Sequence, residues 1–409
     1  MKIASVWARE ILDSRGNPTV EVEVATEAVM GTAAAPSGAS TGKHEAIELR
    51  DGGVRYNGKG VRRAVENVNS VIAPAITGME VTDQEGIDRK MIELDGTQNK
   101  GNLGANAMVA TSMAVLRASA ASQNVFLHEL LGGNMIPHAM FNIVNGGMHA
   151  GNGLAIQEFM IMPQHEFFSE RLRMASEIYH ILGKQLAESI GPSARNVGDE
   201  GGFAPQIDNT YKALDAISHA VEEAGYGHAC PFALDAAASS FYDAKSGTYK
   251  IDGKALKEHE LIDYYADLAK AYPIKSIEDP FDEESFGAFA ALRKELPETQ
   301  IVGDDLVVTN VSRLKQAIDS QSISALLLKV NQVGTLTEAM EAVALCRRNA
   351  LNVVVSHRSG ETEDCFIADF AVGINAGQIK TGAPARGERT AKYNQLLRLE
   401  ERMQVLSQG

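Results

Sequence analysis

The pattern of hydrophobic positions in residues 1–135 predicts two strands followed by helices. In residues 19–26, TVEVEVAT, valines alternate with glutamates, which is typical of a strand with one buried and one solvated face. Residues 3–9 predict a second strand, and the intervening DSRGNP predicts a turn. Helical spacing of apolar residues over 61–72 and the alanine-rich stretch 104–122 predict helices. This order predicts a small α+β domain that spans residues 1–135.

From residue 136 onward the pattern changes to short apolar runs that each end in polar residues. Helical stretches such as 260–272 and 335–350 fill the gaps between the runs. Several of the terminal polar side chains recur roughly every 25 residues, a spacing typical of a repeated strand–helix unit. The repeat predicts a βα-barrel over residues 136–409, with polar side chains at the strand ends where barrels carry their chemistry. The runs are 140–147, 156–163, 194–202, 231–239, 274–280, 300–306, 325–332, 352–360 and 377–384.

A doubly wound open sheet would show the same alternation of strands and helices. However, no phosphate-binding GxGxxG opens the series, and the chain holds more units than a small open sheet uses. The pattern therefore favours an α/β barrel, with a smaller α+β domain in front of it.

Charge and cysteine content narrow the class of function. The net charge of −15 argues against a nucleic-acid-binding protein, and any anionic substrate must meet a locally cationic pocket. Cys230, Cys346 and Cys365 are too few and too widely spaced for a zinc motif or a disulfide framework, which predicts a cytoplasmic protein with reduced thiols. MKIASVWARE has no apolar signal segment, and no apolar run approaches the roughly 20 residues that span a bilayer, so we expect no membrane insertion.

Three carboxylates at predicted strand ends indicate a metal site. Asp235, Glu278 and Asp304 each end a separate strand of the expected barrel. One such carboxylate is usually a helix cap or an ion-pair partner, but three on neighbouring strands repel one another unless a cation lies between them. Oxygen ligands without His or Cys favour a hard cation, Mg²⁺ or as a substitute Mn²⁺.

The run ALLL at 325–328 predicts a strand buried on both faces, yet it ends on Lys329. A buried ammonium group is costly unless it is paired or neutral. With Lys380 and a divalent cation expected nearby, positive neighbours and desolvation would both lower the pKa of Lys329. A neutral lysine is a competent general base, and a cation would stabilise the enolate formed by proton abstraction next to a carboxylate.

The segment SHRSGETED, residues 356–364, predicts an anion site at one strand end. Arg358 and Ser359 offer a guanidinium fork, a hydroxyl and backbone N–H groups, which suit a phosphate. The alternative is an ion-pair cluster with Glu361, Glu363 and Asp364 of the same segment.

Further candidate groups lie on polar loops. Glu200 is flanked by glycines in GDEGG, which leaves it free to approach a ligand, and the stretch 146–159 supplies His149, Gln157 and Glu158. Taken alone, His149 is better explained as a structural residue. The loop GASTGKH, residues 38–44, is not a P-loop, because Walker A needs four residues between its glycines and Ser or Thr after the lysine. Its own residues favour a surface turn over a mobile lid that closes on an anion.

Together these motifs resemble the enolase family along almost the whole chain, from about Ile3 to Glu401. The matching stretches are DSRGNPTVEVEV, PSGASTG, LGANA, NVGDEGGFAP, SIEDPF, VGDDL, LLLKVNQ, VSHRSGETED and GQIKTGAPARGER. The resemblance implies a C-terminal barrel of β2α2(βα)6 topology. It also implies reversible dehydration of 2-phosphoglycerate to phosphoenolpyruvate with two Mg²⁺ per active site.

The resemblance implies a catalytic role for two residues of this chain. Lys329 is expected to remove the C2 proton, and Glu200 to protonate the departing C3 hydroxyl. Glu158 and Gln157 are expected on the substrate side, with Glu158 near that hydroxyl. His149 is expected on a loop that closes over the substrate.

The resemblance also implies the ligands of the metals and of the substrate's charged groups. Asp235, Glu278 and Asp304 are expected to hold the first Mg²⁺, and Ser40 the second, which reverses the surface-turn interpretation of its loop. The residues expected to bind substrate anions are Arg358 and Ser359 for the phosphate, Lys380 for the carboxylate, and His357 beside them.

The resemblance further implies an assembly, a homodimer or an octamer built from dimers. Arg9 and Glu21 are expected to pair with Glu401 and Arg398 of the partner subunit. Two alternative functions remain: another proton-abstracting enzyme of the same superfamily, and a secondary binding role on a surface or secreted pool. The first usually needs a KxK motif on an early barrel strand, whereas residues 156–163 read IQEFMIMP.

Overall fold

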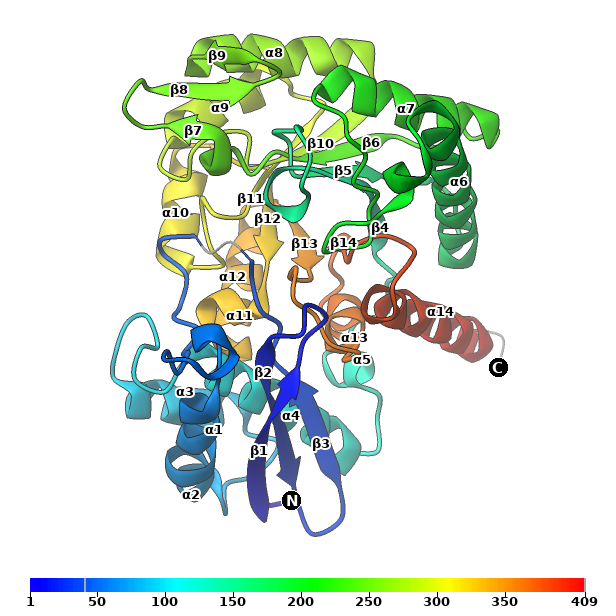
Figure 1. Cartoon of the computed structure of the whole chain (residues 1–409). Helices are drawn as coiled ribbons and strands as arrows, with labels where there is room; N and C mark the ends of the chain where they lie inside the picture. Colours follow the sequence, from blue (N-terminus) through cyan, green and yellow to red (C-terminus); the bar gives the residue numbers. More distant parts are fainter. Residues whose placement is uncertain (40–41, 408–409) are drawn as a thin grey trace.

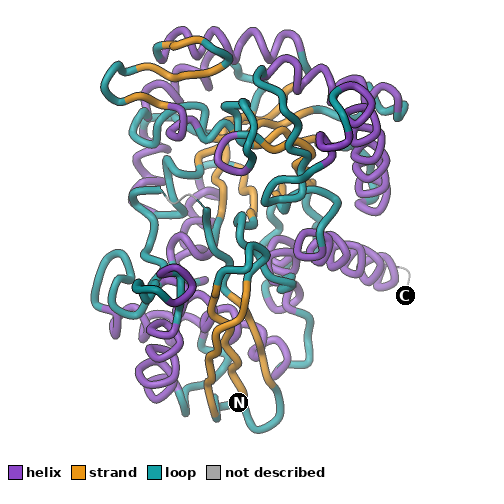
Figure 2. The backbone as a smooth tube through the Cα atoms, in the orientation of Figure 1, coloured by secondary structure: helices purple, strands orange, loops and turns teal. Residues whose placement is uncertain are grey.

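The computed structural model describes residues 1–39 and 42–407 of the 409-residue chain. A small sheet with its helices, formed by the N-terminal residues, lies against a larger closed barrel (Figure 1). Figure 2 shows the barrel strands enclosed by helices, with long loops between the two parts. The prediction of an α/β barrel with a smaller N-terminal α+β domain is confirmed. We propose the segment around residues 135–136, which precedes the first barrel strand, as the domain boundary.

The N-terminal sheet is an antiparallel meander of three strands, in the order β1 (Ser5–Leu12), β2 (Pro18–Ala25) and β3 (Met30–Ala34). The valines of β2 are buried and its glutamates are partly exposed, as the alternation predicts. β1 ends later than predicted because it pairs with β2 along its full length, and the turn closes only where the Asp13 N–H donates to the Asn17 carbonyl at 2.8 Å.

Small side chains allow the N-terminal helices to pack closely on this sheet. A Cβ on Gly31 of β3 would lie 2.2 Å from the carbonyl oxygen of Ala114 in the long helix α4, so only glycine fits there. α4 is buried over most of its length, which explains its alanine-rich sequence. The helices of this part are α1 (Arg62–Asn67), α2 (Ala73–Ile76), α3 (Gln84–Asp95), α4 (Ala105–Ser122) and α5 (Leu127–Leu130).

The barrel closes in the order β10-β11-β12-β13-β14-β4-β5-β6. β5 is antiparallel to both of its neighbours and all other pairs are parallel. Its strands are β4 (His138–Asn145), β5 (Glu158–Ile161), β6 (Phe232–Asp235), β10 (Ile274–Glu278), β11 (Gln300–Gly303), β12 (Ala325–Leu328), β13 (Asn352–Ser356) and β14 (Gln378–Lys380).

The chain order of helices and strands confirms the β2α2(βα)6 topology. Two helices follow the strand pair β4–β5, and the later strands alternate with helices. The barrel helices are α6 (Phe168–Ser189), α7 (Thr210–Glu223), α8 (Glu258–Ala271), α9 (Phe286–Glu295), α10 (Val311–Asp319), α11 (Val330–Val333), α12 (Leu336–Arg348), α13 (Phe366–Gly373) and α14 (Gly387–Ser407). A small sheet of β7 (Tyr242–Asp243), β8 (Thr248–Ile251) and β9 (Lys254–Leu256) lies between β6 and α8.

One of the predicted strand runs is wrong. Residues 194–202 form the end of a 3₁₀ turn and then a loop between α6 and α7, stabilised by isolated bridges such as Val197 with Phe203. The glycines of this run explain the difference. Gly201 has a φ of +86°, and a Cβ on Gly198 would lie 2.4 Å from the His149 carbonyl oxygen.

The period-2 alternation of strands positions the polar groups at one end of the barrel. Inward side chains at the middle of the barrel form a separate apolar cluster that includes Ala233, Val302 and Leu327. Two residues further on, the inward direction recurs, and at that level the chain places Asp235, Asp304 and Lys329. The carboxyl end of the barrel is therefore polar above an apolar plug.

Candidate active site

Buried carboxylates occupy neighbouring strands at this end of the barrel. In the strand register Asp235 lies directly opposite Glu158 of β5 on one side and Glu278 of β10 on the other. All three are at most 3% exposed, and Asp304 follows the next strand, β11. Like charges directly opposite one another in a sheet are destabilising, so this arrangement requires positive charge.

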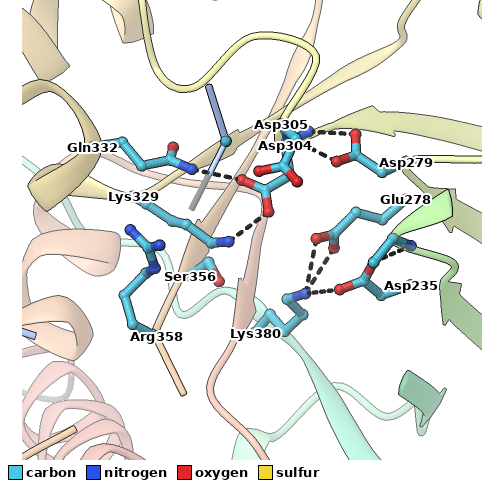
Figure 3. A network of polar contacts seen from close by, with 12 residues as sticks. Asp235, Glu278, Asp279, Asp304, Asp305, Lys329, Gln332, Ser356, Arg358 and Lys380 are labelled. Atoms are coloured by element: carbon cyan, nitrogen blue, oxygen red, sulfur yellow. Dashed lines mark hydrogen bonds and ion pairs between the residues drawn. The ribbon is translucent and has the colours of Figure 1, made fainter. Parts of the chain in front are cut away.

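Lys380, the last residue of β14, supplies part of that charge. Its ammonium Nζ donates to Asp235 Oδ2 at 3.0 Å and to Glu278 Oε1 at 2.9 Å (Figure 3). It also donates to Glu158 Oε1 at 3.2 Å. Burial alone would lower the pKa of Lys380, but the three carboxylates outweigh it and raise that pKa well above its ordinary value. Burial and the charge of Asp235 raise the pKa of Glu278 well above its usual range.

Lys329 follows the fully buried strand β12 and points at the same group of carboxylates (Figure 3). Its Nζ donates to Asp304 Oδ2 at 2.5 Å. Burial lowers the pKa of Lys329, but Asp304 outweighs burial, so the pKa is raised. The sequence predicted a lowered pKa for Lys329. The structure gives a raised pKa, because Lys329 pairs with the carboxylate of Asp304 and not with a cation.

Two residues that the sequence interpretation left without a role orient Asp304. Gln332, three residues after Lys329, donates its amide Nε2 to Asp304 Oδ1 at 2.8 Å. Asp279 accepts the backbone N–H groups of Asp304 and Asp305, at 2.9 and 2.7 Å. Gln332 and Asp279 each lie within three residues of a predicted site residue in the chain. This closeness in sequence is the signal that could have identified them. Burial and the charge of Asp304 raise the pKa of Asp305 to about 8.

A second group of titratable side chains lies across the cavity. Oxygen or nitrogen atoms of His149, Glu158 and Glu200 lie within 4.8 Å of one another. Asn142 of β4, which the sequence interpretation missed, donates to Glu200 Oε2 at 3.0 Å, and His357 Nε2 lies 3.4 Å from Glu200 Oε1. The strands β4 and β5 and three separate connecting segments thus bring these residues together.

Glu158 and Glu200 form a coupled pair of buried acids. Burial and the negative charge of Glu200 raise the pKa of Glu158 well above its usual range. Burial also opposes ionisation of Glu200, but the neighbouring His149 and His357 outweigh it, so the pKa of Glu200 is lowered well below that range. The two carboxyl groups therefore differ in acidity although they lie close together.

The residues of the predicted anion site line the same cavity. Arg358, 4% exposed, is bound at both Nη atoms by Glu45, at 2.9 and 3.1 Å, and also donates to Asn331 Oδ1 at 3.1 Å. Glu45 and Asn331 were not predicted, and Glu45 comes from the N-terminal domain. The hydroxyl of Ser359 accepts from Arg15 at 3.2 Å. The guanidinium fork is therefore aligned for two oxygen atoms, as a phosphate requires.

The loop of residues 36–45 connects the N-terminal domain to this site. Ser40, the predicted second metal ligand, lies outside the described residues. On one side of it, Ser37 forms a bridge with Gly360. On the other side, Lys43 pairs with Glu283 at 3.0 Å and His44 with Glu284 at 2.7 Å. The described parts of the loop therefore contact the barrel and do not form a free surface turn.

The donor set fits a hard divalent cation. Asp235, Glu278 and Asp304 offer oxygen atoms from three adjacent strands, β6, β10 and β11. Nearby, Glu158 Oε2 and Gln157 Oε1 are buried without a hydrogen-bond partner in the described structure. Unpaired buried acceptors beside mutually repelling carboxylates are what an additional cation would satisfy.

One cavity joins all of these groups. Of the predicted site residues within the described part of the chain, all but Glu278 line it, and Glu278 is bound to Lys380 at its edge. A βα-barrel with buried lysines, acids and an all-oxygen donor set at its carboxyl end has the features of a barrel enzyme that uses a divalent metal.

Comparison with known proteins gives the family. The model "Enolase, C-terminal TIM barrel domain" matches residues 133–408, and "Enolase, N-terminal domain" matches residues 3–131. The chain is 57% identical to the enolase of Thermococcus kodakarensis over 99% of this chain and 96% of that protein. It is 58% identical to the enolase of Methanopyrus kandleri over 98% and 96%, respectively. The chain belongs to the enolase family and is a hydro-lyase.

Proposed function

We propose that this protein catalyses the reversible dehydration of 2-phosphoglycerate to phosphoenolpyruvate in glycolysis and gluconeogenesis. The observation that carries the proposal is a single cavity lined by a lysine, by a coupled pair of acids and by an arginine and a serine suited to phosphate. Dehydration of this substrate needs a base at C2, an acid at the C3 hydroxyl and an anion site.

In the first step Lys329 removes the C2 proton and leaves an enolate. Lysine can accept a proton only when neutral, and in the structure Asp304 favours its charged form. A divalent cation held by Asp235, Glu278 and Asp304 would supply positive charge that neutralises Asp304, lowers the pKa of Lys329 and stabilises negative charge on the substrate. Gln332 keeps Asp304 oriented while this exchange of partners takes place.

In the second step the acid pair delivers a proton to the C3 hydroxyl, which leaves as water. We assign the donation to Glu200, with Glu158 beside the hydroxyl and Gln157 next to it. The position of Glu200 in the same buried group as Glu158 and His149 supports this assignment. His149, buried on the loop beside Glu200, would keep that carboxyl oriented.

The remaining groups hold the substrate. Arg358 and Ser359 would bind the phosphate, with His357 behind them, and Lys380 would face the carboxylate from the centre of the site. Phosphate binding requires Arg358 to exchange or share its contact with Glu45. The direct test is to add 2-phosphoglycerate to the purified protein with and without Mg²⁺ and to record the ultraviolet absorbance of phosphoenolpyruvate. The absorbance should rise only with Mg²⁺, and no rise with Mg²⁺ would refute the proposal.

Removal of the cation should abolish activity and leave the fold intact, because the carboxylates lie on a large independent core. We propose two Mg²⁺ per active site, with Mn²⁺ as a substitute. Excess chelator should eliminate turnover without changing the far-ultraviolet circular dichroism, and Mg²⁺ should restore turnover. Persistent turnover in chelator would contradict a cation-dependent mechanism.

The Asp304→Asn variant should weaken Mg²⁺ binding by about 10–100-fold without unfolding the protein. Asp88→Asn is the matched control, since Asp88 is a buried carboxylate that binds Thr337 far from the cavity. It should change stability but not Mg²⁺ binding, as measured by titration calorimetry. Equal loss of Mg²⁺ binding in both variants would show that the effect is unspecific.

We also propose that the chain assembles as a homodimer or as an octamer of dimers. Arg9 pairs within the chain with Glu21 and Glu23, at 2.6 and 2.7 Å, and these side chains are partly exposed beside Trp7, which is 58% exposed. Arg398 and Glu401, the proposed contacts of the partner subunit, are also exposed. These exposed charged groups and the exposed ring of Trp7 can therefore contact a second copy of the chain.

Light scattering at micromolar concentration should therefore give at least twice the mass of 43.9 kDa. The Arg9→Glu variant should raise the dimer dissociation constant about 10-fold or more, because it places like charges together. Arg173→Glu, on the exposed face of α6, is the control and should not change it. A monomeric native protein would contradict the proposed assembly.

We propose a cytoplasmic location on the chemistry of the cysteines. Cys230, Cys346 and Cys365 are free thiols, and the first two are buried. Free thiols are typical of a reducing compartment. Among the described residues, no helix combines the length and the apolar character needed to cross a membrane.

A further inference from the structure

Arg389 of α14 connects two loops of the active site although it does not line the cavity. Its side chain is fully buried. Nη1 donates to the Arg358 carbonyl and to His357 Nδ1, both at 2.7 Å. Nη2 donates to the Ser359 carbonyl at 2.5 Å and to the Asp199 carbonyl at 2.9 Å. One guanidinium group thus joins the loop that carries the anion site to the loop that carries Glu200.

The contact with His357 has a chemical consequence. A guanidinium group has only donors, so His357 Nδ1 must accept the hydrogen bond. Burial lowers the pKa of His357 well below its ordinary value, which keeps the ring neutral. In a neutral ring with Nδ1 as acceptor, the proton is on Nε2, and Nε2 lies 3.4 Å from Glu200 Oε1.

The backbone next to Glu200 is shaped to accommodate this arginine. Gly382 has a φ of +86°, and a Cβ there would lie 2.8 Å from Arg389 Cδ and 2.7 Å from the Glu200 carbonyl oxygen. The next residue, Ala383, donates its N–H to that same carbonyl at 2.9 Å. The stem of Arg389 and the backbone of the proposed acid therefore occupy one closely packed unit.

We propose that Arg389 is a positioning residue that holds His357 in the Nε2-protonated tautomer, so that the ring presents an N–H group and not a lone pair 3.4 Å from Glu200 Oε1. Through its carbonyl contacts it also fixes the distance between the Glu200 loop and the anion site. Its effect on turnover rests on the proposed function, whereas its effect on the tautomer does not. Arg389 acts through His357 and the loops and does not touch the substrate.

The tautomer can be measured directly by solid-state nitrogen NMR of protein with ¹⁵N-labelled histidine. The His357 signal is assigned by its absence in His357→Gln. The native protein should show a neutral ring with the proton on Nε2. In Arg389→Met this single state should be lost, because Nδ1 no longer has an obligatory donor and the repulsive positive charge is gone. A proton on Nδ1 in the native protein would overturn the proposal, even if the variant fails to fold, as would an unchanged tautomer in a folded variant.

The kinetic consequence separates positioning from general stabilisation. Arg389→Met should lower dehydration on the order of 10²-fold and lower C2 hydrogen exchange by less, because it misdirects the partner of Glu200 more than Lys329. Arg389→Lys, which retains a donor, should recover part of the loss. Equal loss of both reactions would overturn the positioning role.

Arg171 offers a matched control at the opposite end of the barrel. It is also a buried arginine, 6% exposed, and donates only to the carbonyls of His165, Glu166 and Pro137. Arg171→Met should lower stability but leave the ratio of exchange to dehydration unchanged; the same altered ratio there would overturn the proposal. If the native protein does not dehydrate 2-phosphoglycerate at all, the proposed function fails, and the tautomer measurement still decides the role of Arg389.

Discussion

Replacing Lys329 with alanine should abolish both C2 hydrogen exchange and dehydration of 2-phosphoglycerate. Lys329 is the proposed base, and without it no group within reach of C2 can accept the proton. The loss in each reaction should exceed the ~10²–10⁴-fold typical of one general base, because stabilisation of the enolate by the cation is also wasted. Exchange is measured by NMR as deuterium entering C2 from deuterated water, and dehydration by absorbance.

Lys100→Ala is the matched control for this variant. Lys100 is also a buried lysine with one carboxylate partner, Glu338 at 2.8 Å, but it lies outside the cavity. It should lower stability and leave both reactions within about twofold, since the base is intact. If Lys329→Ala kept exchange while Lys100→Ala lost it, Lys329 would not be the base.

Replacing Glu200 with glutamine should separate the two proton transfers. Glutamine preserves shape and hydrogen bonding but cannot donate a proton of comparable acidity to a poor leaving group. Dehydration should fall by more than ~10²–10⁴-fold, while C2 exchange continues because Lys329 and the carboxylates of the metal site are untouched. Glu158 is proposed to lie beside the hydroxyl, so residual dehydration would measure how well it replaces Glu200 as the acid.

The control for this substitution is Glu400→Gln. Glu400 is a buried carboxylate that accepts the N–H groups of Phe168 and Ser169 at the start of α6, outside the cavity. Its replacement should affect stability and neither reaction. A loss of exchange in Glu200→Gln equal to its loss of dehydration would contradict separate roles for acid and base.

Much of the fold could be predicted because its signals are local. The alternation in β2 and the apolar run of β12 each predicted a strand. The burial of the faces of both strands agrees with these predictions. The recurrence of polar strand ends predicted the barrel, and with it the grouping of Asp235, Glu278 and Asp304 on adjacent strands. The run 194–202 misled because apolar content alone does not distinguish a strand from a glycine-rich loop that packs closely on its neighbours.

The partners inside the site could not be predicted, because they depend on contacts between distant parts of the chain. Glu45 binds Arg358 across 313 residues of sequence, and Lys380 reaches Asp235 across 145. The same limit explains the expectation for the pKa of Lys329: its direction depends on whether a carboxylate or a cation is the nearer partner, which only geometry decides. Arg389 ends the matching stretch GQIKTGAPARGER, but that stretch gave no role for it, because its role arises from contacts with two distant loops.

Deuterium exchange at C2 distinguishes the two proton transfers that we assign to Lys329 and Glu200. Glu200→Gln and Lys329→Ala are incubated with 2-phosphoglycerate and Mg²⁺ in deuterated water, and the deuterium at C2 of the recovered substrate is compared. We expect deuterium in the sample from Glu200→Gln and none above background in the sample from Lys329→Ala. Deuterium in the Lys329→Ala sample and none in the Glu200→Gln sample would contradict this expectation and reverse the assignment of acid and base.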